Sequence, residues 1–129
     1  MSTIQRFEDL EAWKISRGVT KEIYRISSSG LFSRDFGLRD QIRRASVSIM
    51  SNIAEGFERD GDKEFVQFLA IAKASAGEVR SQLYVALDQE YISETEFNSL
   101  FQSLVENSRV ISGLMKYLRQ SDLKGKKFR

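Results

Sequence analysis

The fold class follows from residues 65–86, which read FVQFLAIAKASAGEVRSQLYVA. Small and apolar residues recur there at alternating steps of four and three, at Phe65, Leu69, Ala72, Ala76, Val79, Leu83 and Ala86. These steps average 3.5 residues, the spacing of a helix that buries one stripe against neighbours crossing it at about 20°. A half-buried strand would instead alternate every second residue. The stretch therefore predicts a long helix, from about Lys63 to Asp88, in a helical bundle.

Three other segments carry the same spacing. Residues 9–26 place one stripe at Ala12, Ile15, Val19, Ile23 and Ile26. Residues 38–55 place another at Leu38, Ile42, Ala45, Ile49 and Ile53. Residues 94–119 place a third at Phe97, Phe101, Leu104, Ser108, Ile111, Met115 and Leu118. Four helices joined by short loops pack up-down-up-down, so the predicted fold is all-α, an antiparallel four-helix bundle over residues 1–120. We expect residues 121–129 to form a flexible basic tail.

Two helix ends have recognisable capping residues. Gly56 follows the second segment and is predicted to be its C-terminal cap, because glycine adopts a positive φ without a Cβ clash. Ser93 and Glu96 precede the fourth segment with the spacing of a capping box, in which each side chain accepts a backbone N–H of the first turn.

The composition excludes several chemistries. The chain has 129 residues and contains no cysteine, histidine or proline. Disulfides, thiolate nucleophiles, zinc fingers and imidazole bases are therefore ruled out. The serines have no histidine to activate them, and a di-metal bundle would need Glu-x-x-His. We expect a protein that is not an enzyme, with no catalytic residue, no cofactor and no metal.

Location and charge are less distinctive. No stretch approaches the ~18–20 apolar residues of a membrane helix, and the N-terminus lacks the apolar core of a signal peptide. We therefore expect a cytoplasmic protein with no membrane partner. The formal net charge of +2 conceals a basic end, since the last six residues hold Lys124, Lys126, Lys127 and Arg129 without an acid.

The second segment carries an apolar row in addition to its core stripe. Val47, Met50 and Ala54 lie roughly 140° away from that stripe on a helical projection. A bundle helix needs only one apolar stripe, so this row predicts an interface between subunits. Scattered surface hydrophobic residues are the alternative.

A polar row flanks the core stripe of the same segment. It consists of Gln41, Arg44, Ser48, Asn52 and Glu55, with Arg59 just beyond. Glu55 lies in the last turn, where the helix dipole disfavours a negative charge, so we expect Arg59 or a neighbouring helix to compensate it. The row predicts a structural hydrogen-bond network near the loop to the third helix. A ligand or partner site is the alternative.

Basic residues provide a second functional hypothesis, the binding of RNA or DNA. The candidate residues near the second helix and its following loop, and in the tail, are Arg39, Arg43, Arg44, Arg59, Lys63, Lys124, Lys126, Lys127 and Arg129. Because Asp40, Glu55, Glu58, Asp60 and Asp62 interleave with them, an internally paired, solvated surface is the competing interpretation.

Several motifs together resemble the family of 23S rRNA intervening-sequence proteins. Residues 37–49 and 51–57 resemble its signature, with Gln41-Ile42-Arg43-Arg44-Ala45 followed by Asn52-Ile53-Ala54-Glu55-Gly56. Residues 7–13 resemble its opening motif, and Glu64-Phe65, Phe68-Leu69, Ser75, Glu78 and Gln82-Leu83 resemble its third helix. Met50 stands where the family commonly has proline.

The resemblance implies an antiparallel four-helix bundle that assembles as a ring-like homopentamer and has no enzymatic activity. It therefore favours a non-catalytic oligomeric scaffold or adaptor as the function. Nucleic-acid binding stays open as the alternative.

Overall fold

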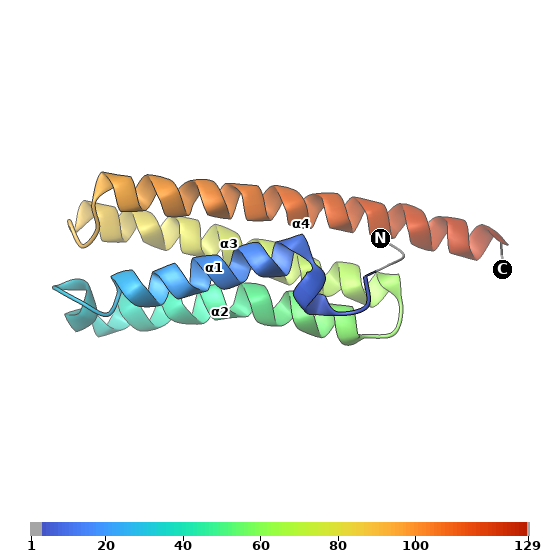
Figure 1. Cartoon of the computed structure of the whole chain (residues 1–129), viewed down its shortest axis with the longest axis horizontal. Helices are drawn as coiled ribbons and strands as arrows, with labels where there is room; N and C mark the ends of the chain where they lie inside the picture. Colours follow the sequence, from blue (N-terminus) through green and yellow to red (C-terminus); the bar gives the residue numbers. More distant parts are fainter. Residues whose placement is uncertain (1–3, 129) are drawn as a thin grey trace.

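The protein is a bundle of four long antiparallel helices, α1 (Glu11–Ile26), α2 (Phe36–Glu58), α3 (Asp62–Asp88) and α4 (Glu94–Phe128) (Figure 1). The structure, a computed structural model, describes the backbone of residues 4–128 and the side chains of residues 4–121. Short 3-10 helices, η1 (Phe7–Asp9) and η2 (Phe32–Arg34), precede α1 and α2. Each long helix packs against the next, and α1 closes the bundle against α4. The predicted fold class is confirmed.

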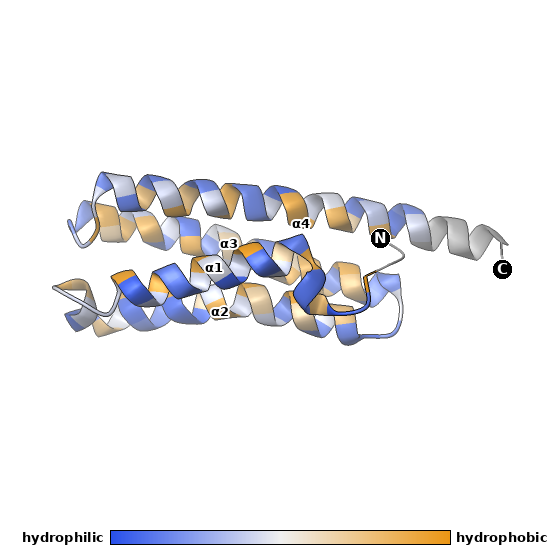
Figure 2. Ribbon diagram, in the orientation of Figure 1, coloured by the Kyte–Doolittle hydropathy of each residue, from blue (hydrophilic) through white to orange (hydrophobic). Residues whose placement is uncertain are grey.

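The core lies on the axis of the bundle and is built from the predicted stripes. Ile23, Ile42, Ile49, Leu69 and Leu83 have no exposed surface. Hydrophobic and hydrophilic residues alternate along each helix, as expected when every helix buries one stripe (Figure 2). Burying a leucine or isoleucine side chain contributes about 1.5–3 kcal/mol each, so these stripes are the main source of stability.

Two stripes differ from the prediction by a small rotation of the helix. On α4, Leu100 and Asn107 are buried, while Phe101 and Ser108 are only half-buried. On α1, Ser16 is fully buried and Ile15 is half-buried. The Ser16 hydroxyl donates to the carbonyl of Trp13 at 2.8 Å, which satisfies it inside its own helix.

The predicted role of Gly56 is wrong. Helix α2 continues to Glu58, and Gly56 is a buried residue inside it rather than a left-handed cap. A Cβ built on Gly56 would lie 2.7 Å from the Cβ of Phe68 and 2.9 Å from Cδ1 of Phe65. The glycine is therefore needed because α2 and α3 approach each other closely there. The positive φ occurs instead at Gly61, just before α3.

The loops at one end of the bundle are joined by side chains. Asp35 caps α2 by accepting the backbone N–H of Leu38 through Oδ1 at 3.1 Å. Its other oxygen accepts the hydroxyl of Tyr91, from the α3–α4 loop, at 2.9 Å. That hydrogen bond, together with burial, raises the pKa of Tyr91 above its usual value. The Tyr91 ring also stacks on buried Phe32, with ring centroids 5.3 Å apart. These contacts fix the α1–α2 loop to the α3–α4 loop.

The predicted capping box at the start of α4 is confirmed. The backbone N–H of Glu96 donates to the Ser93 hydroxyl, and the N–H of Ser93 donates to Glu96 Oε1, both at 3.0 Å. Arg25 of α1 lies 3.3 Å from the other Glu96 oxygen. The Ser93 N–H and Arg25 hold the pKa of the Glu96 carboxyl below its ordinary value.

Replacing Glu96 with glutamine is expected to make the free energy of unfolding depend less steeply on pH in acid. A lowered pKa means that Glu96 stabilises the fold above its unfolded pKa of about 4.3, and that this contribution is lost as the pH falls through the lower folded pKa. Glu96→Gln should thus lose less stability between about pH 5 and pH 3 in urea titrations. Glu94→Gln in the same turn is the control, and identical profiles for wild type and Glu96→Gln would contradict the prediction.

Helix α4 is longer than the sequence pattern predicted, since it extends from Glu94 to Phe128 rather than to Arg119. The side chains of Lys124, Lys126 and Lys127, and all of Arg129, lie outside the described residues. The flexibility of residues 121–129 stays a prediction.

Candidate functional site

A surface groove between α1 and α2 brings together residues that the sequence placed in three separate roles. It has a volume of about 490 Å³ and is lined by Tyr24, Asp40, Arg43, Arg44, Val47 and Ser48. Residues 43, 44, 47 and 48 come from consecutive turns of α2, and their spacing puts them on one side of that helix. Tyr24 comes from α1 and was not predicted. We call this site the α1–α2 groove.

Arg43 is held in a fixed position in the groove. Its Nε donates to the hydroxyl of Ser27 at 2.8 Å, and its Nη2 donates to the hydroxyl of Ser28 at 3.0 Å. Its guanidinium carbon lies 4.6 Å from the centroid of the Tyr24 ring, which is a cation–π geometry. Arg43 therefore makes all its described contacts with neutral groups, and its positive charge is not neutralised by a carboxylate among residues 4–121.

The neighbouring charges leave the groove positive. Arg39 pairs with Asp40 at 3.0 Å, and its guanidinium lies 4.8 Å from the ring of exposed Phe36. Arg44 is exposed and forms no ion pair with a residue that the structure describes. Three arginines thus share one carboxylate. The groove can hold an anionic group beside an aromatic and an aliphatic side chain.

The predicted polar network divides into two parts. Asn52 donates from Nδ2 to the carbonyl of Ser48 at 2.8 Å, and the Ser48 hydroxyl lies 2.9 Å from that of Ser75 on α3. Glu55 and Arg59 form a separate ion pair of 2.8 Å, which supplies the compensation expected for Glu55 at the end of α2. Within the described part of the chain, the side chains of Gln41 and Arg44 form no hydrogen bond with the Ser48–Asn52 group or with the Glu55–Arg59 pair.

The predicted apolar row points outward only in part. Val47 is 38% exposed, whereas Met50 and Ala54 are half-buried. Tyr24 lines the groove together with Val47 and is 43% exposed, while Phe36 at the start of α2 is 63% exposed. The assignment of this row to a subunit interface stays a prediction.

The candidate nucleic-acid-binding residues form two groups rather than one patch. Arg39, Arg43 and Arg44 lie in the first half of α2, while Arg59 follows its other end. Sixteen residues of helix separate Arg43 from Arg59, a distance of about 24 Å along the axis. Arg59 is further occupied by Glu55 and by the ring of Phe68, 5.0 Å from its guanidinium. Lys63 is exposed at the start of α3.

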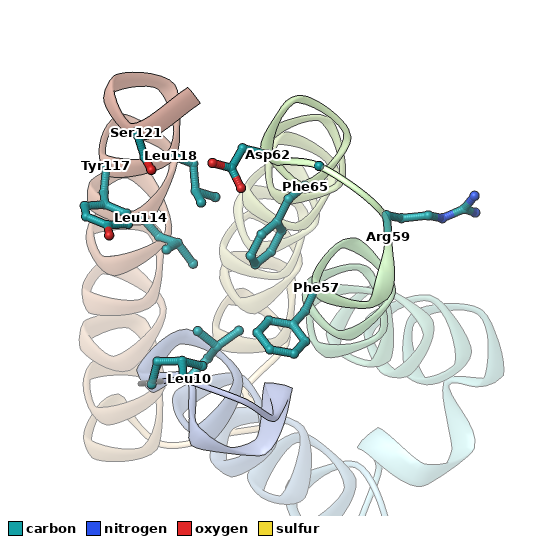
Figure 3. A pocket seen from close by; sticks show the side chains of 11 residues that line it. Leu10, Phe57, Arg59, Asp62, Phe65, Leu114, Tyr117, Leu118 and Ser121 are labelled. Carbon is teal, nitrogen blue, oxygen red and sulfur yellow. The ribbon is translucent and has the colours of Figure 1, made fainter. Parts of the chain in front are cut away.

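A second cleft lies at the end of the bundle that contains the α2–α3 loop. It has a volume of about 260 Å³ and an apolar floor that includes Leu10, Phe57, Phe65 and Leu118. The carboxylate of Asp62 points toward Leu118, while Arg59 extends away from the cleft (Figure 3). This cleft has room for a small apolar group. Among the site residues predicted from the sequence, Arg59 alone is part of its described lining.

The structure adds two findings on chemistry and membranes. Within the described residues, no group of three or more acidic side chains is placed to share a metal ion. In the same part of the chain, no helix has the length and apolarity that crossing a bilayer requires.

These features define a class of protein, an antiparallel four-helix bundle with a positive, partly apolar groove on the pair α1 and α2. Residues 8–113 match the family model described as 23S rRNA-intervening sequence protein. Because this match spans most of the chain, the protein belongs to that family, as the sequence motifs indicated.

A solved structure supports the same fold. It is a protein of unknown function from the S23 ribosomal protein family of Bacteroides thetaiotaomicron VPI-5482, with a TM-score of 0.74. The two chains are 23% identical, and the similarity covers 81% of this chain and 98% of the other. No significant match is found among curated proteins.

Proposed function

We propose that the protein is a non-catalytic scaffold or adaptor that works as an assembly of several copies. The observation that carries this proposal is the set of apolar side chains left exposed in the α1–α2 groove and at the start of α2. Phe36, Tyr24 and Val47 are respectively 63%, 43% and 38% exposed, although the bundle has a complete core. Exposed apolar side chains grouped on one face are typical of protein interaction surfaces.

We propose a ring of five copies, since the family resemblance implies a ring-like homopentamer. A ring needs two different patches on each subunit, one that donates and one that receives. The absence of histidine and cysteine from the sequence supports a role that requires no acid–base or thiol chemistry.

The oligomeric state of the full chain tests this proposal. We expect sedimentation velocity and light scattering at tens of micromolar to show one defined species larger than a monomer, which dissociates on dilution. A chain that is monomeric throughout this concentration range would overturn the scaffold proposal.

Nucleic-acid binding is the second candidate function, and the position of Arg43 favours it. Two hydroxyl groups and the Tyr24 ring hold its guanidinium in place, and exposed Arg44 adds a second charge next to it. An ordered arginine without a carboxylate partner can meet a phosphate with little loss of conformational entropy.

Salt dependence provides the test of this second function. If two to four phosphates are contacted, the affinity for a fluorescent single-stranded 20-nucleotide RNA should fall about 7- to 50-fold between 50 and 200 mM salt. Arg44→Ala should weaken binding more than Arg109→Ala, because Arg109 already pairs with Glu106. No binding at 50 mM salt, or binding that salt does not change, would contradict it.

A further inference from the structure

A second exposed apolar surface lies on the opposite pair of helices. Tyr84 on α3 is 50% exposed, and its ring centroid lies 5.0 Å from that of Phe97 and 5.6 Å from that of Phe101, both on α4. Val105, one turn beyond Phe101, is 46% exposed. We call the set of Tyr84, Phe101 and Val105 the α3–α4 surface. Tyr84 is its projecting member, because Phe97 is buried beneath it.

The two surfaces carry opposite charges. The α1–α2 groove is lined by Arg43, Arg44 and Asp40, and the Asp40 carboxylate is already paired with Arg39 outside the groove. The chain from Ser81 to Ser108 contains Asp88, Glu90, Glu94, Glu96 and Glu106 and no base. Arg80 and Arg109 flank this range. Arg80 donates to the Ser108 hydroxyl at 3.0 Å and Arg109 pairs with Glu106, so the excess of acids lies at the end of the α3–α4 surface nearest the loops. Asp88 and Glu94 are exposed and form no ion pair within the described residues. Apolar contacts at both places are thus flanked by groups that attract each other.

The two surfaces also lie at similar heights along the bundle. The contact between Ser48 and Ser75 fixes the register of α2 against α3. Tyr84 is nine residues beyond Ser75, or about 13 Å toward the end that holds the α1–α2 and α3–α4 loops. Arg39 is nine residues before Ser48, which is the same distance in the same direction. Both loops lie at this end of the molecule (Figure 1).

The surfaces face away from each other across the bundle. The helix pair α1 and α2 forms one side, and the pair α3 and α4 forms the other (Figure 1). Because the two patches lie on opposite sides of the bundle, each copy can bind two neighbours, one through each patch. When the rotation from one copy to the next closes, such a contact makes a ring of bundles that all point the same way.

We propose that the α3–α4 surface of one copy docks into the α1–α2 groove of the next copy. The Tyr84 ring packs beside Tyr24 at the end of the groove nearest the loops, Val105 packs against Val47 further along the bundle, and the arginines face Asp88 and Glu94. This inference rests on the proposed assembly of several copies and goes beyond it by assigning the two patches and making the contact heterologous.

Two variants test the assignment, each with a charge placed in one patch. Val47→Glu damages only the groove, and Tyr84→Glu damages only the α3–α4 surface. We expect each variant alone to associate at least about 100-fold more weakly than the unmodified chain, because docking would bury an unpaired charge. Ile71→Glu is the matched control. Ile71 is 50% exposed like Tyr84 but belongs to neither patch, so its substitution should leave the assembly unchanged.

Mixing the two variants distinguishes a heterologous contact from a symmetric one. Tyr84→Glu keeps an intact groove and Val47→Glu keeps an intact α3–α4 surface, so the mixture should form one-to-one dimers and nothing larger. Self-association of either variant alone would mean that like patches bind each other, and would overturn the proposal. Circular dichroism of each variant confirms that the fold is intact.

The outcomes separate this inference from the proposed function. If the unmodified chain assembles and both variants assemble equally well, the scaffold proposal stands and the patch assignment is wrong. If the unmodified chain is monomeric, both fail. Loss of RNA binding by Val47→Glu without any change in assembly would assign the groove to nucleic acid and would also overturn the docking proposal.

Discussion

Replacing Gly56 with alanine is expected to lower the free energy of unfolding by about 2–3 kcal/mol. The new Cβ would lie 2.7 Å from the Cβ of Phe68, a distance that ordinary carbon contacts do not reach. A Cβ is fixed to its backbone, so the clash can be relieved only by moving α2 away from α3. Urea unfolding at a fixed protein concentration measures the change.

Gly18→Ala is the matched control for this substitution. Gly18 also lies inside a helix, and a Cβ built on it meets no atom within 4 Å. Alanine at that position should stabilise the protein by about 0.5–1 kcal/mol, because it reduces the flexibility of the unfolded chain and has a higher helix propensity. The same glycine-to-alanine substitution should thus lower the free energy of unfolding at position 56 and raise it at position 18. Equal effects would show that close helix packing does not explain Gly56.

Replacing Asn107 with leucine is expected to raise the free energy of unfolding by about 1–3 kcal/mol. Asn107 is fully buried in α4, and within the described residues neither its Oδ1 nor its Nδ2 has a hydrogen-bond partner. Leucine has the same number of side-chain heavy atoms and the same branching, so it removes the polar groups without adding atoms. Thermal and urea unfolding at one protein concentration should both shift upward.

Asn107→Asp provides the opposite case at the same position. A buried carboxylate without a partner should cost about 3–5 kcal/mol at pH 7, and this cost should shrink in acid as the carboxyl is protonated. If Asn107→Leu instead lowers stability, then the amide is satisfied in solution, for instance by a buried water, and the prediction is wrong.

Most positions of the apolar stripes could be predicted, although Leu38 of α2 and Ile15 of α1 are only half-buried. Ile42, Ala45, Ile49 and Ile53 of α2 are all buried, as expected. On α4 the expected stripe included Ser108, whereas the structure buries Asn107. Either polar residue breaks an apolar row equally, so spacing alone does not show which of them faces the core.

The role of Gly56 shows a second limit. A glycine after an amphipathic segment is typical of a helix end, and the sequence suggested one. The same residue also permits two helices to approach closely, and that requirement arises only when α2 packs against Phe65 and Phe68 of α3. The distance between two helices is a property of the assembled bundle, which no single segment contains.

The candidate site was predicted in its parts but not as a unit. Arg43, Arg44, Val47 and Ser48 were identified from the pattern on α2, in separate roles. Tyr24 completes the groove and was missed, because the register of α1 against α2 determines which residue lies opposite Arg43. One sign was available in the sequence, since Tyr24 is a large aromatic residue outside the predicted stripe of its helix.

The unequal lengths of α1 and α3 give the two ends of the bundle different resistance to local opening. Helix α1 has 16 residues and α3 has 27, so α1 is shorter by about 16 Å, and the remaining corner is covered by η1 and Leu10. Amide hydrogens of residues 4–10 should therefore exchange with solvent long before those of the helices around Phe32 and Tyr91, where side chains link both loops. Fraying at that corner would expose the apolar floor of the cleft while the rest of the fold stays intact.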